Sequence, residues 1–76
     1  MNIRNKIFAK NLRRERKIKG FTQEQIAAKL NIGQKRYASW EEGRGAPDFL
    51  YLSKLCELFQ IDDLYLFISK DLVESG

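Results

Sequence analysis

Residues 21–42 read FTQEQIAAKLNIGQKRYASWEE, and this stretch decides the fold. Thr22 and Gln25 stand three residues apart, which is the spacing of a capping box, where each side chain bonds the backbone N–H of the other residue. The apolar residues at positions 26, 27 and 30 then share one helix face. Asn31 tolerates the left-handed backbone of a tight turn. The pattern predicts a short helix that begins near residue 23 and stops at Asn31.

A second helix is predicted over Gln34 to Glu42, after a turn of only three residues. Tyr37 and Trp40 share one face of this helix. The opposite face carries Gln34, Lys35, Ala38 and Ser39. A turn this short sets the helices at roughly 90–120°, so the apolar face of the second packs on the first while its other face projects outward. Projecting Gln, Lys and Ser side chains suit the major groove of DNA, because Gln bonds adenine, Lys bonds guanine and Ser bonds either.

The charge of the chain is unevenly divided along its length. The 76 residues hold 14 Lys and Arg, 10 Asp and Glu and no His, so the net charge is +4. A cut after Gly45 separates an N-terminal part with 12 basic and 4 acidic residues from a C-terminal part with 2 and 6, which gives charges of +8 and −4. A segment of charge +8 is attracted to a polyanion, first of all nucleic acid and second an anionic membrane surface.

Composition argues against several other classes of protein. Cys56 is the single cysteine and histidine is absent, so the chain can form neither an internal disulfide nor a tetrahedral zinc site, and no metal or cofactor is expected. No apolar run approaches the ~20 residues of a membrane span, and we expect a soluble protein of a reducing cytoplasm. No nucleophile stands beside a recognisable general base, so no enzymatic activity is expected.

The rest of the chain also has helical patterns. A first helix is expected from about Ile7 to Lys19. Asp48 and Asp62 are placed to cap a fourth and a fifth helix. The predicted fold class is therefore all-α, a compact five-helix bundle that forms a single domain over residues 1–76. The aromatic residues expected in its core are Phe8, Phe21, Trp40 and Phe49.

The expected fifth helix holds more apolar residues than one core can bury. Residues 64–68 read LYLFI, and five consecutive helical residues point around more than half of the circumference. We therefore expect a homodimer through a region of about residues 62–76, which would also stabilise a chain whose single core supplies at most about 3–5 kcal/mol. The expected interface residues are Leu64, Tyr65, Phe67 and Ile68.

Two alternatives to this dimer stay open. In the first, the C-terminal tail folds back and covers the apolar patch within one chain. In the second, the chain is a protein-binding adaptor or an antitoxin-like co-regulator that uses its apolar C-terminal surface and does not read DNA. Binding to RNA is less favoured, because the basic part lacks an exposed aromatic pattern on which unpaired bases would stack.

Two motifs and a proline give the chain a wider resemblance. The motifs are FTQEQIAAKLNI at residues 21–32 and YASWEEGR at residues 37–44, and the proline is Pro47. Together they resemble the lambda-repressor-like helix-turn-helix family (XRE type, with phage repressors and Cro) over about residues 12–61. The resemblance implies a five-helix domain whose helix-turn-helix spans about residues 23–42. It also implies a transcriptional regulator, most simply a repressor, that binds a roughly palindromic double-stranded DNA operator as a homodimer in the cytoplasm, bacterial or phage-encoded.

The same resemblance implies roles for individual side chains. Those that match base-reading positions are Gln34, Lys35 and Ser39. Gln23 and Arg44 match phosphate-binding positions. Arg36 points toward the flank of its helix and is therefore also expected to bind a phosphate. Arg16 and Glu41 match a partly buried ion pair that holds the first helix against the third.

The chain departs from the family pattern at three positions. Asn31 stands where Gly is common, and Asn accepts a positive φ. Gly33 stands where Ser or Thr usually caps the recognition helix, so it caps less well and offers no hydroxyl to DNA. Tyr37 replaces a common Ile or Val, so its ring is expected to be buried with the hydroxyl at the edge.

Overall fold

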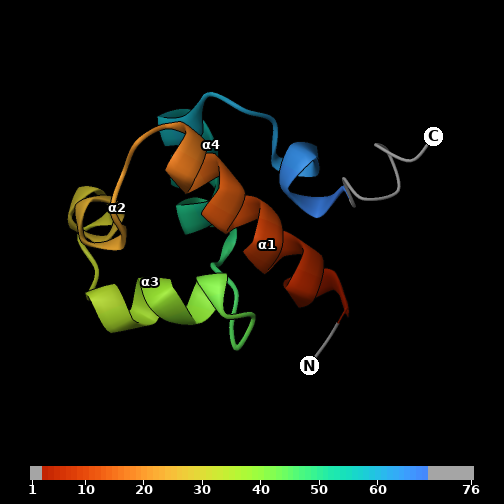
Figure 1. The fold of residues 1–76 in the computed structure, drawn as a ribbon, viewed down its shortest axis with the longest axis horizontal. Coiled ribbons are helices and arrows are strands. Elements are labelled where there is room, and N and C mark those ends of the chain that lie inside the picture. Colours follow the sequence, from red (N-terminus) through yellow and green to blue (C-terminus); the bar gives the residue numbers. More distant parts are fainter. Residues whose placement is uncertain (1–2, 69–76) are drawn as a thin grey trace.

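The computed structural model describes residues 3–68, which fold into a series of helices (Figure 1). The elements are α1 (Ile3–Ile18), α2 (Gln23–Leu30), α3 (Gln34–Glu41), α4 (Phe49–Phe59) and the 3-10 helix η1 (Asp63–Phe67). This range contains no strand, so the predicted all-α class is confirmed. None of its helices is long and apolar enough to cross a membrane.

The stretch that decides the fold forms two helices and a tight turn, as its sequence predicts. The Thr22 hydroxyl accepts the backbone N–H of Gln25 at 3.1 Å, and the Gln25 side chain accepts the backbone N–H of Thr22 at 2.8 Å, which closes the capping box. Asn31 ends α2 in the left-handed region with a φ of 59°. Gly33 precedes α3 and supplies no side-chain cap. The backbone N–H groups of Asn31 and Ile32 donate to the carbonyls of Ala28 and Ala27, so groups within this stretch close the turn.

The predicted fifth α-helix is wrong. Residues 63–67 form a short 3-10 helix, so the described residues contain four α-helices where five were expected. The Asp62 side chain also makes no capping hydrogen bond. The physical reason is a buried amide in α1: Asn11 Nδ2 donates to the backbone carbonyls of Leu66 at 2.9 Å and Ile68 at 2.8 Å. In a longer α-helix these carbonyls would accept backbone N–H groups of the next turn, but here they accept the Asn11 amide. The backbone of Ile68 is already extended, so the helix does not continue.

Helix α1 lies at the centre of the domain, with α3 on one side and η1 on the other (Figure 1). One cluster of buried side chains joins all five elements. Its members are Phe8, Leu12, Ile26, Ala27, Leu30, Tyr37, Trp40, Leu55, Phe59 and Leu66. Because Leu66 belongs to η1 and is fully buried, the 3-10 helix covers a part of the core that the α-helices leave open.

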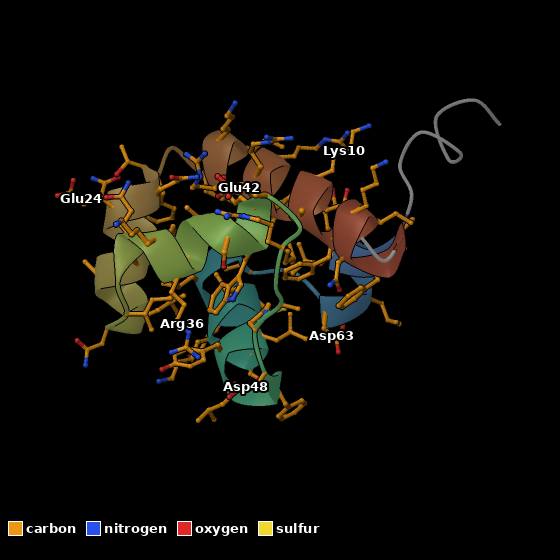
Figure 2. The ribbon with its side chains drawn as sticks, turned by 90° about the horizontal axis from the view of Figure 1, so that it is seen from below. Lys10, Glu24, Arg36, Glu42, Asp48 and Asp63 are labelled. Carbon is orange, nitrogen blue, oxygen red and sulfur yellow. The ribbon has the colours of Figure 1, made fainter. Side chains whose placement is uncertain are left out.

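Only part of the expected aromatic core is correct. Phe8 and Trp40 are buried, and Phe21 is half-buried with its ring centroid 6.4 Å from that of Phe59. Phe49, by contrast, is 79% exposed. It is the first residue of α4, directly after Asp48, whose side chain caps the helix by accepting the Tyr51 N–H at 3.1 Å. This end of α4 projects from the body of the domain (Figure 2), so the Phe49 ring has no core to enter.

Candidate nucleic-acid interface

Helix α3 is held by one face and exposes the other. Tyr37, Trp40 and Glu41 are buried, whereas the first three residues of the helix are exposed. The Tyr37 and Trp40 rings meet edge to face with centroids 5.8 Å apart, which fixes the rotation of α3 about its axis. The outward face of α3 is therefore presented by a rigid support, which is the requirement for a helix that reads a surface by side-chain position.

The structure does not treat the three base-reading candidates alike. Gln34 and Lys35 are exposed in the first turn of α3. Ser39 is half-buried, and its hydroxyl donates to the carbonyl of Arg36 at 2.6 Å. Its proton is therefore engaged within α3, and the oxygen remains as an acceptor. Gln34 and Lys35 share one accessible end of the helix, while Ser39 lies one turn away.

Arg36 is held on one flank of α3 by aromatic rings. Its guanidinium carbon lies 4.9 Å from the ring centroid of Tyr51 and 5.9 Å from that of Trp40. Lys54 approaches the same Tyr51 ring, with its Nζ 5.7 Å from the centroid. A guanidinium held against aromatic rings still has N–H groups that can bind a phosphate. The sequence analysis missed Tyr51 and Lys54, because their contact with α3 joins segments that are distant in the chain.

A buried carboxylate joins three elements behind α3. The two Glu41 oxygens accept from Arg16 Nε at 2.6 Å and Arg16 Nη2 at 3.1 Å, so the pair named in the sequence is bidentate. Arg16 Nη1 also donates to the carbonyl of Phe21 at 2.9 Å. Gln23 Nε2 donates to Glu41 at 3.0 Å. The Gln23 side chain, a phosphate-binding candidate, thus turns inward to Glu41, while its backbone N–H remains at the start of α2.

Burial and charge shift the pKa values of this network. Burial raises the pKa of Glu41, but its contacts with Arg16, Tyr37 and Gln23 outweigh burial and leave the pKa below its ordinary value. The bond to Glu41 raises the pKa of Arg16. Burial, and then the polar contact with Glu41 and its negative charge, raise the pKa of Tyr37. The Tyr37 hydroxyl is buried beside Glu41 with no partner in hydrogen-bonding geometry, so the expectation that it reaches the edge is wrong.

The loop after α3 carries the last phosphate-binding candidate. Arg44 is exposed, and its guanidinium forms an ion pair with Glu42, the capping residue directly after α3. The sequence analysis missed this role of Glu42. A phosphate that binds Arg44 would displace this carboxylate or lie beside it, so Glu42 lowers the positive charge that the loop offers to an anion.

The four dimer-interface candidates differ in exposure. Leu64 is 70% exposed and Ile68 is 44% exposed. Tyr65 is half-buried. Phe67 is half-buried and stacks on Phe8, with ring centroids 5.2 Å apart. Phe67 thus packs partly against its own chain, and the accessible apolar surface belongs to Leu64 and Ile68. Residues 69–76 of the expected dimerisation region lie outside the described residues.

The side chains of residues 5–68 offer no metal centre. No group of three or more Cys, Asp or Glu residues in this part of the chain is placed to hold a metal ion. The Cys56 thiol is half-buried, and burial, followed by the nearby charges of Asp63 and Asp62, raises its pKa. A thiol with a raised pKa is a poor nucleophile at neutral pH.

Comparisons with known proteins agree with this geometry. A model of the helix-turn-helix family matches residues 12–66. The HTH-type transcriptional regulator ImmR of Bacillus subtilis (strain 168) is 38% identical over 62 residues, which cover 82% of this chain and 48% of ImmR. The chain spans about half the length of this curated relative. No solved structure matches the chain. With a capped α2, a three-residue turn and an anchored α3 inside the matched range, the chain belongs to the lambda-repressor-like (XRE) helix-turn-helix family.

Proposed function

We propose that this chain is the sequence-specific, double-stranded-DNA-binding part of a transcriptional regulator, with α3 in the major groove. The observation that carries the proposal is the anchoring of α3: three buried side chains hold one face while Gln34 and Lys35 stand exposed at its first turn. Family membership and the name of ImmR, a transcriptional regulator, support it.

Base reading is proposed for the exposed end of α3. Gln34 can bond both the N6 and N7 positions of adenine, and Lys35 can donate to the O6 and N7 acceptors of guanine. Ser39, whose hydroxyl proton is engaged within α3, would act as an acceptor or by contact with a base. Gln34 and Lys35 therefore carry most of the proposed sequence preference.

Backbone binding is proposed for three groups around α3. Arg36 lies on one flank of the helix, and Arg44 lies in the loop after its end. The start of α2 supplies backbone N–H groups and the positive end of its helix dipole, and Gln23 is its first residue. Contacts of this kind position a protein on DNA without reading its sequence.

We further propose that the protein acts as a homodimer and represses transcription. A two-fold pair would present two copies of α3 to successive major grooves about 34 Å apart on a palindromic operator. The exposed Leu64 and Ile68 supply apolar surface for such a contact, with Tyr65 and Phe67 beside them. A dimer bound at an operator would block access of RNA polymerase.

Selection of preferred duplexes from a random pool tests the proposed function. We expect one preferred sequence for the wild-type chain, bound with an affinity that falls steeply with salt. Lys35→Ala should relax the preference at one base-pair position, at a cost of about 1–3 kcal/mol. Arg44→Ala should weaken binding to all sequences about equally. Lys19→Ala, at an exposed position after α1, is the control for loss of one positive charge.

Two results would count against this assignment. Equal binding of the wild-type chain to all duplexes would reject sequence-specific recognition. That result would favour the alternative function as a protein-binding adaptor or antitoxin-like co-regulator. A change of base preference in Arg44→Ala would show that this residue reads bases and does not only bind the backbone.

A further inference from the structure

Helix α1 carries a row of positive side chains on one face. Its members, called here the α1 stripe, are Lys6, Lys10, Arg13 and Lys17, and all four are exposed. They stand four, three and four residues apart, a spacing that keeps them within one side of an α-helix. Eleven residues of helix rise about 16 Å, so the stripe is long enough to follow several phosphates of one strand.

The α1 stripe borders the C-terminal end of α3. A surface groove of about 300 Å³ lies between the two helices, and its lining residues are Lys6, Ala9, Lys10, Arg13, Glu41 and Glu42. Figure 2 shows Lys10 and Glu42 on the same side of α3, with Arg36 on the opposite side. Positive side chains therefore flank the proposed reading helix on both sides, as the two phosphate strands flank a major groove.

The carboxylates in this groove do not cancel the positive charge. Glu41 is held by Arg16 and Gln23, and Glu42 is paired with Arg44. The charge of each carboxylate is thus balanced by an arginine that does not belong to the α1 stripe. The positive charges of Lys6 and Arg13 are therefore not neutralised by the two carboxylates of the groove. An anion with several charges, held beside α3, is the ligand that this arrangement favours.

We propose that the α1 stripe binds the phosphodiester backbone of DNA that flanks the bases read by α3. The inference rests on the proposed function, because the position of the stripe beside α3 favours the same duplex as its ligand. The stripe extends the proposed footprint beyond Arg44 along one strand. It contributes affinity without base preference, since lysine and arginine bind phosphates as charges.

The salt dependence of binding tests the inference. The double variant Lys6→Gln with Arg13→Gln removes two charges from the groove. The double variant Lys19→Gln with Lys29→Gln removes two exposed charges elsewhere and is the matched control. On the duplex that the wild-type chain selects, the slope of log affinity against log salt should decrease by about 2 per bound chain in the first variant and stay unchanged in the control. Thermal unfolding of both variants verifies that each remains folded.

A second measurement uses the length of the duplex. Removal of the flanking base pairs should weaken binding of the wild-type chain and of the control more than binding of the Lys6 and Arg13 variant, which keeps only two charges of the stripe. The inference is overturned if that variant keeps the wild-type slope, or if both double variants lose slope equally. A wild-type chain without sequence preference contradicts the proposed function, and the slope difference between the variants on the same duplexes still decides whether the stripe binds DNA.

Discussion

Glu41 is the residue on which the candidate interface most depends. Its buried carboxylate receives Arg16 from α1 and Gln23 from α2 while it stands on α3 itself, so one side chain orients three helices. The pKa of Glu41 lies below its ordinary value of 4.5. A depressed pKa in the folded state means that the ionised carboxylate stabilises the fold, fully at pH values above the unfolded pKa and less as the pH falls through the folded pKa.

Glu41→Gln should therefore destabilise the domain in a pH-dependent way. At about pH 7 we expect a loss of about 3 kcal/mol, because Arg16 keeps its charge in a buried site without its counter-charge. The difference from wild type should shrink as the pH falls below about 4.5, where Glu41 of the wild type becomes protonated. Urea unfolding over this pH range measures it. Glu24→Gln, on the exposed first turn of α2, is the control, and a difference that does not change with pH would contradict the role assigned to Glu41.

Substitution of Tyr37, in contrast to that of Glu41, is expected not to lower the free energy of unfolding. Its ring is fully buried in the core, and its hydroxyl lies beside Glu41 but makes no hydrogen bond of good geometry. A buried hydroxyl without a partner costs about 1–3 kcal/mol, and Phe keeps the shape of the ring without this cost. Tyr37→Phe should leave the unfolding free energy unchanged or raise it by about 1 kcal/mol. A loss of more than about 1 kcal/mol in urea unfolding would show that the hydroxyl makes a favourable contact with Glu41.

At the scale of the element, the ends of the helices explain most of what the sequence predicted correctly. The capping box at Thr22, the left-handed Asn31 and the cap at Asp48 each involve residues that are close in the chain. Interactions of this kind are decided by side-chain type and by backbone angles over a few residues. The 3-10 geometry of η1 is different, because Asn11 bonds it across 55 and 57 residues of sequence.

Two glycines should respond in opposite directions to the same substitution. Gly33 has a φ of −70° and open space around its α-carbon, so Gly33→Ser adds a cap to α3 and reduces the freedom of the unfolded chain. We expect a gain of about 0.5–1 kcal/mol. Gly20 has a φ of +82°, so Gly20→Ser should cost about 1 kcal/mol. Thermal unfolding of the two variants compares them directly, and destabilisation by Gly33→Ser would contradict the open geometry of that cap.

At the scale of the whole molecule, positive charge and exposed apolar side chains lie on different parts of the surface, which suggests which side faces DNA and which side faces a second chain. Lys10 of the α1 stripe lies on one side of α3 in Figure 2, whereas Asp48 and Asp63 lie on the other side. Among the described residues, large apolar side chains are exposed at three separate places: Ile18 at the end of α1, the first turn of α4, and the segment of Leu64 and Ile68. The last of these is the proposed dimer contact.

Leu64→Asp tests this contact without damage to the core, because Leu64 is 70% exposed. We expect the wild-type chain to sediment as a dimer at tens of micromolar and the variant to sediment as a monomer, since a charge would be buried at the interface. Leu50→Asp, at a residue 63% exposed on α4, should leave the dimer intact. A wild-type chain that stays monomeric both with and without DNA would reject the homodimer.

The sequence by itself determined the helix-turn-helix, its boundaries and the anchored face of α3, because these depend on periodicity and on caps within a few residues. Only the tertiary structure decided which groups meet across the chain: Arg36 on Tyr51, Gln23 on Glu41, and Asn11 on the backbone of η1. It also decided that Phe49 is exposed. A helical pattern shows which residues share a face, but the partner of that face depends on how distant helices pack, and no local rule contains this information.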